Sequence, residues 1–253
     1  MIDTHAHLQW RDFDRDRQEV IRRAFDAGVK KIVNIGYDLQ ASREAVKIAH
    51  EEKDVYAVVG IHPHNAKSLG SDALAELRKI AQDREVVAIG EIGLDYYRNL
   101  SPKSLQKEAL EQQINIARDL GLPVVIHDRE AHNDILDVLR TIGKDVGGVM
   151  HCYSGSLEMA KKVIDLGYYI SIAGPVTFPN ARKLHELVRW LPEESLVLET
   201  DCPWLSPQSR RGKRNEPSYI LETAERVAEL KAMPAVELVR LASKNAAKLF
   251  RLS

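Results

Sequence analysis

Two histidines separated by one residue stand within the first seven positions of the chain. The opening segment, residues 1–7, has the composition of a short buried strand. Side chains alternate between the two faces of a strand, so His5 and His7 point the same way. Neutral imidazole is a preferred ligand of zinc and other first-row divalent metals. The pair therefore indicates half of a metal site, with two unrelated surface histidines as the alternative.

Further side chains of metal-binding type follow later apolar runs of the sequence. They are Glu91, His127, His151 and Asp201. His62 and His64 follow another such run, with Pro63 fixing the turn between them. No role is assigned to the three histidines on expected helices, which are His50, His132 and His185. A carboxylate within such a set can bridge two cations and leave positions open for water and substrate.

A repeating pattern of short and long segments positions these side chains. Eight runs rich in valine and isoleucine are interpreted as strands, at 1–7, 30–35, 55–61, 86–91, 123–127, 147–151, 168–172 and 195–201. The stretches between them fit one helix each and carry apolar residues at three- and four-residue spacing. Strands and helices alternating in this way predict a closed, parallel, TIM-like (β/α)8 barrel. The tail at 216–252, divided at Pro234, adds one further helix. We predict a single barrel domain over 1–253.

The predicted barrel fold indicates where an active site would lie. Such barrels build their active sites where the strands end and the βα loops begin. The six strongest ligand candidates all stand at the ends of expected strands, and they are His5, His7, Glu91, His127, His151 and Asp201. Random scatter would not produce this placement. The sequence therefore predicts a metal site at one mouth of the barrel.

Composition excludes several other classes of protein. The chain has 36 Lys plus Arg and 37 Asp plus Glu, a formal net charge of −1, so no global field favours a polyanion. No apolar run approaches the ~18 residues that a membrane span needs. The first residues lack the features of a secretory signal. We expect a cytoplasmic protein with no membrane contact and no obligate protein partner. Cys152 and Cys202 each follow an expected ligand, so they are interpreted as small buried residues on the opposite strand face.

Six motifs in order along the chain resemble the TatD family of metal-dependent hydrolases, within the amidohydrolase superfamily. They are the segments at 3–7 (DTHAH), 60–64 (GIHPH), 90–96 (GEIGLDY), 125–127 (VIH), 151–155 (HCYSG) and 199–205 (ETDCPWL). The resemblance covers the whole chain. It implies a distorted eight-stranded barrel, a centre for divalent metal and, as in characterised members, magnesium- or zinc-dependent DNase activity.

The same resemblance implies a role for each ligand. His5, His7 and Asp201 would hold one metal, His127 and His151 the other, and Glu91 would bridge the two. Asp201 would also accept the proton of the attacking water, although a helix N-cap or a simple ligand is the alternative. His62 would face the substrate phosphate, against the alternative of a loop histidine hydrogen-bonded to backbone.

Three other features near the expected mouth allow two interpretations each. Glu199 would orient a ligand histidine or form an ion pair inside the barrel. Arg211 lies in the densest positive cluster, at 209–217, and would bind substrate phosphate or pair with a helix carboxylate. Four aromatic side chains would stack on bases or simply pack, and they are Tyr96, Tyr97, Tyr153 and Trp204.

The sequence therefore predicts a hydrolase with two divalent metal ions per chain, Mg²⁺, Mn²⁺ or Zn²⁺. Its expected substrate is DNA, single-stranded or at an end, cleaved as by an exonuclease. Asp201 and Glu91 carry the chemistry in this prediction, and His62 and Arg211 bind the substrate. A small-molecule or aminoacyl-ester or amide hydrolase of the same superfamily is the alternative, because a two-metal centre attacks carbonyl and phosphorus alike. A binding protein that has lost catalysis is disfavoured, because the six ligands are intact.

Overall fold

Eight parallel strands form one sheet in chain order in the computed structural model, which describes residues 1–252. They are β1 (Ile2–Ala6), β2 (Lys31–Ile35), β3 (Val55–Val59), β4 (Val86–Asp95), β5 (Val124–Arg129), β6 (Gly148–Met150), β7 (Tyr168–Ile172) and β8 (Leu196–Leu198). A parallel bridge between Ala6 and Cys202 brings the end of β1 against the segment after β8 and closes the barrel. The predicted TIM-like fold is confirmed.

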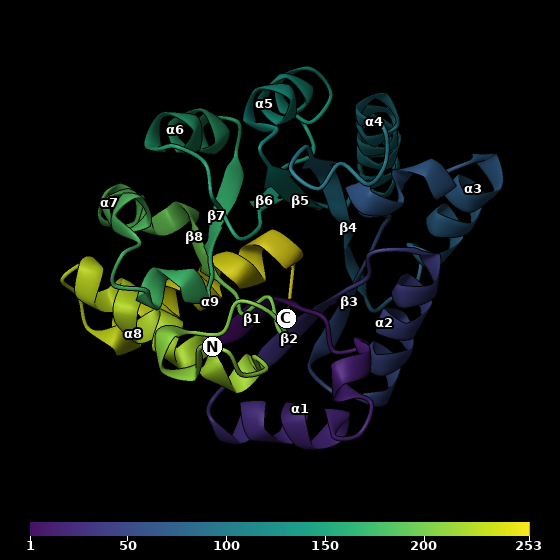
Figure 1. Cartoon of the computed structure of the whole chain (residues 1–253). Coiled ribbons are helices and arrows are strands. Elements are labelled where there is room, and N and C mark those ends of the chain that lie inside the picture. The colour runs from purple at the N-terminus through teal and green to yellow at the C-terminus, as the bar shows by residue number, and fades with distance from the viewer. Residues whose placement is uncertain (253) are drawn as a thin grey trace.

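Nine α-helices accompany the strands of the described chain. They are α1 (Arg17–Asp26), α2 (Leu39–Glu51), α3 (Ser71–Ile80), α4 (Lys103–Leu120), α5 (His132–Thr141), α6 (Leu157–Asp165), α7 (Arg182–Trp190), α8 (Ile220–Leu230) and α9 (Ala235–Phe250). Helices α1 to α8 follow one another counter-clockwise around the strands in Figure 1. Because βα connections are right-handed, this view is from the carboxyl ends of the strands. None of the helices in residues 1–252 is long and apolar enough to cross a membrane.

The strand boundaries differ from the predicted ones where the candidate ligands stand. Strand β4 runs on to Asp95 and β5 to Arg129, because the two strands keep pairing from Ile92 and Ile126 onward. Glu91 and His127 therefore lie within strands rather than at their last residues. Strands β6 and β8 are shorter than expected, so His151 and Asp201 lie in the loops that follow them.

The two cysteines show the effect of these boundaries. Cys202 is fully buried against the outer core, as predicted. Strand β6 ends at Met150, so the alternation that placed Cys152 on the opposite face does not reach it. Cys152 has a φ of 40° and is only half-buried, and the prediction of a buried strand residue is wrong there.

The apolar core forms two separate clusters. The larger one lies between the strands and the surrounding helices. The smaller one contains short side chains from six strands, Val33, Val58, Ala88, Val125, Val149 and Val197, and it is joined by Ala246, Leu249 and Phe250 of α9. Alternate residues of a barrel strand point inward, so this second cluster is the barrel interior. Helix α9, which crosses the middle of the ring in Figure 1, closes it from the end opposite the mouth.

The Phe250→Ala substitution tests this role of α9. Phe250 is 2% exposed and packs on the interior cluster, so we expect the free energy of unfolding to fall by about 3–5 kcal/mol. Val236→Ala is the matched control, because Val236 belongs to the same helix but is 83% exposed, and it should change stability by about 0.5 kcal/mol or less. Urea unfolding measures both. Equal effects of the two variants would show that α9 does not close the barrel.

Candidate metal centre

The carboxylate of Glu91 lies at the centre of the histidines that the sequence singled out. Its Oε1 is 2.7 Å from His127 Nδ1 and 2.9 Å from His151 Nε2. Its Oε2 faces the other way, 3.5 Å from His5 Nε2 and 3.8 Å from His7 Nε2. One carboxylate oxygen therefore faces each pair of imidazoles, which is the arrangement that a bridging ligand requires.

The first group of side chains consists of His5, His7 and Asp201. The Nε2 atoms of the two histidines are 3.1 Å apart. Asp201 Oδ1 lies 3.5 Å from His7 Nε2 and 3.7 Å from His5 Nε2. These three ligand atoms lie close enough together to hold one ion. Asp201 has a φ of 55°, and its backbone N–H donates to the carbonyl of His5 over 2.8 Å. The backbone thus fixes the aspartate against the strand that carries both histidines.

The second group consists of His127 and His151. His127 Nδ1 and His151 Nε2 are 3.2 Å apart and both face Glu91 Oε1. The other nitrogen of His151, Nδ1, is 3.3 Å from the carboxylate of Glu199. Glu199 therefore contacts a candidate ligand histidine, as its predicted orienting role requires. The same distance is that of an ion pair with a protonated His151, so the contact fits both interpretations of Glu199.

His62 borders this second group. Its Nδ1 accepts a hydrogen bond from the backbone N–H of His64 over 3.1 Å, as the alternative interpretation expects. Because that nitrogen is an acceptor, the neutral ring carries its hydrogen on Nε2, which lies 3.4 Å from Glu91 Oε1. The ring therefore directs a donor toward the centre of the site as well.

Burial and mutual contact shift the pKa values of this cluster. Burial alone would raise the pKa of Glu91, but His151 and His62 oppose it, and the net pKa lies well below the usual range. Burial would lower the pKa of His151, yet Glu91 and Glu199 raise it well above its ordinary value. Burial lowers the pKa of His5 and of His62 to about 4. The contact with Glu91 thus favours the protonated form of His151 and the ionised form of Glu91, and binding of a metal ion requires such an imidazole to lose its proton.

The donors present fit divalent metal ions. Imidazole nitrogens face one another at hydrogen-bond distance in both groups, and carboxylate oxygens complete each set. In addition, His5 Nδ1 and Glu199 Oε2 are buried without a hydrogen-bond partner in the described chain. Together with His151, these two residues form a further set whose ligand atoms lie close together. Nitrogen and oxygen ligands of this kind suit zinc and manganese, whereas magnesium prefers more oxygen.

Sequence reasoning missed Asp95. Its carboxylate is 2.7 Å from His64 Nε2 and 3.4 Å from His127 Nε2, on the side of the His127 ring away from Glu91. Alternate residues of β4 include Glu91, Gly93 and Asp95. The spacing from Glu91 would therefore have predicted Asp95 near the site if the strand had been known to continue past Glu91. Gly93 allows the approach of β5, because a Cβ there would lie 1.9 Å from the carbonyl oxygen of His127.

Two of the three arginines in the basic loop after β8 form ion pairs within the described chain, and the third does not. Arg214 pairs with Asp16 and Glu216, and Arg210 pairs with Glu222 of α8. Arg211 is exposed and makes no ion pair with any residue of 1–252, while its guanidinium lies 5.1 Å from the ring centre of Phe178. The alternative that paired Arg211 with a helix carboxylate is therefore not observed, because its neighbours hold those carboxylates.

Asn215 fastens the same loop to the metal centre. Its buried side-chain amide donates to the carbonyl of Thr200 over 2.9 Å and to that of Trp204 over 2.7 Å. Its backbone N–H donates to the carbonyl of Pro203 over 3.0 Å. One side chain thus fixes the backbone on both sides of the turn that carries Asp201.

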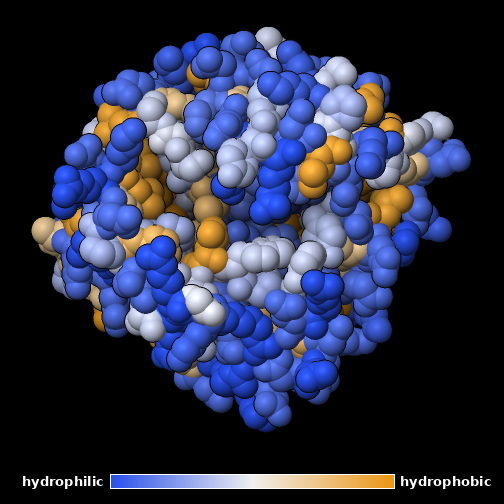
Figure 2. All heavy atoms as spheres, viewed as in Figure 1, coloured by the Kyte–Doolittle hydropathy of each residue, from blue (hydrophilic) through white to orange (hydrophobic). Residues whose placement is uncertain are grey.

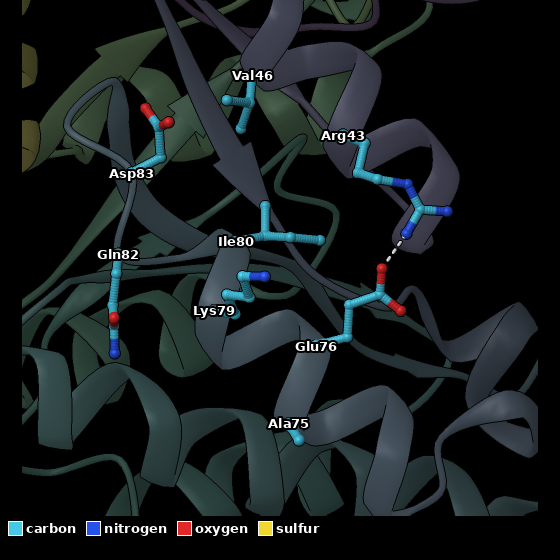
Figure 3. Close-up of a pocket in the computed structure, with 8 residues that line it drawn as sticks. All are labelled: Arg43, Val46, Ala75, Glu76, Lys79, Ile80, Gln82 and Asp83. Atoms are coloured by element: carbon cyan, nitrogen blue, oxygen red, sulfur yellow. Dashed lines mark hydrogen bonds and ion pairs between the residues drawn. The ribbon is translucent and has the colours of Figure 1, made fainter.

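The mouth of the barrel carries the site, and a groove on the outer helices does not. Figure 2 shows a mostly hydrophilic face that is hollowed near its middle, where the loops after the strands meet. A separate groove of about 790 Å³ lies between α2 and α3, where an ion pair joins Arg43 and Glu76 (Figure 3). Its lining contains none of the histidines or carboxylates of the metal centre.

Comparisons with known proteins agree with this geometry. The family described as TatD related DNase matches residues 2–251. The metal-dependent hydrolase YabD of Bacillus subtilis, itself uncharacterized, is 43% identical over 254 residues that cover 100% of both chains. The 3'-5' ssDNA/RNA exonuclease TatD of Erwinia tasmaniensis is 35% identical over 259 residues, again covering 100% of both. The crystal structure of YJJV, a TatD homolog from Escherichia coli K12, has a TM-score of 0.94 and 31% identity, covering 100% of this chain and 98% of that one.

The isosteric substitution Glu91→Gln tests the bridging position. Loss of one negative charge between the two groups should reduce the metal content from about two ions per chain to one or fewer. Metal analysis after equilibrium dialysis measures it. Glu76→Gln, which changes a carboxylate on the outer groove, should leave the content unchanged. Two ions retained in Glu91→Gln, with full affinity, would contradict the assignment.

Proposed function

Because the chain belongs to the TatD family of metal-dependent hydrolases, we propose that it hydrolyses phosphodiester bonds of DNA, acting on single strands or ends. The observation that carries the proposal is the Glu91 carboxylate, which turns one oxygen to each of two histidine groups. Relatives named 3'-5' ssDNA/RNA exonucleases, at 35% identity over their whole length, support a nucleic acid substrate. The proposed catalytic unit is a single domain over 1–253.

Six side chains would hold two divalent ions in this proposal. His5, His7 and Asp201 would form one set. His127 and His151 would form the other, with Glu91 shared between the two. Bound ions of this kind make water a stronger nucleophile and offset the charge that develops on phosphate oxygens. Magnesium, manganese and zinc are the candidate ions.

Asp201 is the proposed general base. Its side chain is 13% exposed, whereas that of Glu91 is 5% exposed, so Asp201 faces the mouth from which water and substrate come. Its Oδ1 lies beside His5 and His7, and its second carboxylate oxygen can accept a proton from the attacking water. The hydrogen bond to the His5 carbonyl fixes the residue in this position.

His62 and Arg211 are the proposed contacts to the substrate phosphate. Burial lowers the pKa of His62 to about 4, so the ring is neutral at pH 7 and donates only through Nε2. That donor lies beside Glu91, where a phosphate oxygen would come to rest. Arg211 would hold a neighbouring phosphate from the mouth, because its charge is not compensated within residues 1–252.

The direct test is hydrolysis of end-labelled single-stranded DNA by metal-free protein resupplied with magnesium, manganese or zinc. Metal-dependent laddering would support the proposal and reveal the polarity of digestion. A series of substrate lengths separates it from the alternative ester or amide hydrolase. Cleavage of small carboxylic esters, with no cleavage of DNA under any of the three metals, would favour that alternative.

Asp201→Asn should lower kcat on single-stranded DNA by about 100-fold or more, because the amide keeps a ligand oxygen but cannot accept the proton. Initial rates at saturating substrate measure the effect, and circular dichroism checks the fold. Asp119→Asn, a change at an exposed carboxylate on α4, is the control and should keep the full rate. A rate within a few-fold of the unsubstituted enzyme would exclude Asp201 as the base.

Arg211→Gln should weaken binding of single-stranded oligonucleotides and reduce the slope of log K against log salt by about 0.7, the value for one phosphate contact. Arg210→Gln is the matched control from the same loop, because Arg210 is already paired with Glu222. Fluorescence anisotropy at several salt concentrations measures both. If the two variants have the same slope, Arg211 does not contact phosphate.

A further inference from the structure

Three aromatic side chains form one continuous surface next to His7. The ring centre of Trp204 is 5.1 Å from that of His7 and 4.9 Å from that of Trp10. Tyr37 continues the cluster, 5.5 Å from Trp10 and 6.0 Å from His7. We call Trp10, Tyr37 and Trp204 the aromatic wall. Its members follow β1, β2 and β8, so the wall flanks the mouth on the side of the first ligand group.

The wall is fixed in place by backbone hydrogen bonds. The N–H of Trp204 donates to the carbonyl of Asp201 over 3.0 Å, and Asn215 donates to the carbonyl of Trp204 over 2.7 Å. The N–H of Trp10 donates to the carbonyl of His7 over 3.0 Å. The backbone of both tryptophans is therefore anchored through residues next to the proposed ligands. The indole of Trp204 packs against Trp10 and His7 and is nevertheless 40% exposed, so it offers a surface for a planar ligand.

The other aromatic rings named in the sequence as possible stacking partners are already engaged. Lys103 lies over the ring of Tyr96 and Arg129 over that of Tyr97, at 4.1 and 4.6 Å from the ring centres. Tyr153 is buried and donates to the carbonyl of Ser156. Within residues 1–252, no cation lies over any ring of the aromatic wall. Of the four candidates, Trp204 alone is exposed and has no cation of the described chain over its ring.

We propose that Trp204, supported by Trp10 and Tyr37, is the stacking surface for the nucleobase of the nucleotide whose phosphate is hydrolysed. The inference rests on the proposed phosphodiesterase function and adds a base-binding subsite to it. A phosphate at Glu91 lies next to His7, and the ring of His7 contacts the wall. Every base has a π-face, so such a surface accepts all four bases and gives no sequence preference.

The test compares phosphodiesters that share one leaving group but differ in whether they carry a base. The p-nitrophenyl esters of thymidine 5'-monophosphate and 3'-monophosphate carry thymine, and methyl p-nitrophenyl phosphate carries none. Trp204→Leu in the metal-loaded enzyme should lower kcat/KM about 10-fold for at least one thymidine ester. It should leave the methyl ester within about 2-fold, and Trp204→Phe should restore most of the loss.

Inhibition of the unsubstituted enzyme by reaction products gives a second readout, and this readout does not depend on a substitution that could destabilise the fold. Thymidine 5'-monophosphate and thymidine 3'-monophosphate should inhibit better than the deoxyribose phosphates that lack the base. Trp204→Leu should remove that advantage. Trp190→Phe, which changes the remaining tryptophan, on α7 away from the mouth, should preserve it.

The outcomes separate this inference from the function on which it rests. An equal loss on the thymidine esters and the methyl ester, or no loss on any of them, would overturn the stacking role while leaving the phosphodiesterase intact. If the enzyme with magnesium, manganese or zinc hydrolyses neither these diesters nor single-stranded DNA, the proposed function fails and the subsite fails with it. If it cleaves single-stranded DNA but none of the diesters, the comparison of product inhibition decides the stacking role.

Discussion

The burial of one carboxylate among imidazole rings is the constraint to which the rest of this structure responds. Glu91 is 4% exposed and lies within ion-pair distance of His5, His7, His62, His127 and His151. A buried charge without partners would cost several kcal/mol. The barrel must therefore bring residues of five strands, or of the loops that follow them, to one point. Each histidine there lowers the free-energy cost of burying Glu91. A divalent cation satisfies the same atoms better than protons do, since it neutralises the carboxylate and accepts the lone pairs of the rings together.

The contacts that close the barrel also hold the first group of candidate ligands, His5, His7 and Asp201, together. The Thr4 hydroxyl of β1 donates to the carbonyl of Leu198 in β8 over 2.9 Å. Beyond β8, a bridge at Ala6 and Cys202 and the bond from the Asp201 N–H to the His5 carbonyl continue the seam. Below them, the Asp3 carboxyl accepts from the hydroxyl of Thr200 over 2.6 Å, and burial raises the pKa of Asp3 to about 8. Any change that opens the seam would separate His5 from Asp201, so stability and metal binding are linked there.

The sequence was sufficient for the order of elements and for the six ligand candidates that the structure brings together around Glu91, because both follow from local pattern. Each of the eight valine- and isoleucine-rich runs overlaps a strand, and the break at Pro234 separates α8 from α9. The extent of each strand was not predictable, since it depends on the neighbour: β4 continues past Glu91 only because β5 pairs with it. That error hid Asp95. Similarly, the early end of β6 removed the alternation on which the position of Cys152 depended. His62 needed the fold itself, because only the fold shows that one ring nitrogen meets backbone while the other meets Glu91.

The candidate site is open to solvent at only one end of the barrel, because the other end is filled by apolar side chains. Inward-facing valines and the apolar face of α9 fill the interior below Glu91, so water, metal and substrate reach the carboxylate only from the mouth. Low polarity behind the site also strengthens every charge interaction in front of it. At the mouth, the loop after β8 supplies Asp201, Trp204 and Arg211 together, and Asn215 holds that turn. Glu216, the next residue, binds Arg23 of α1 through two hydrogen bonds of 3.0 Å. Asp201, Trp204 and the basic loop are thus tied to one anchored segment, which fixes their spacing at the mouth.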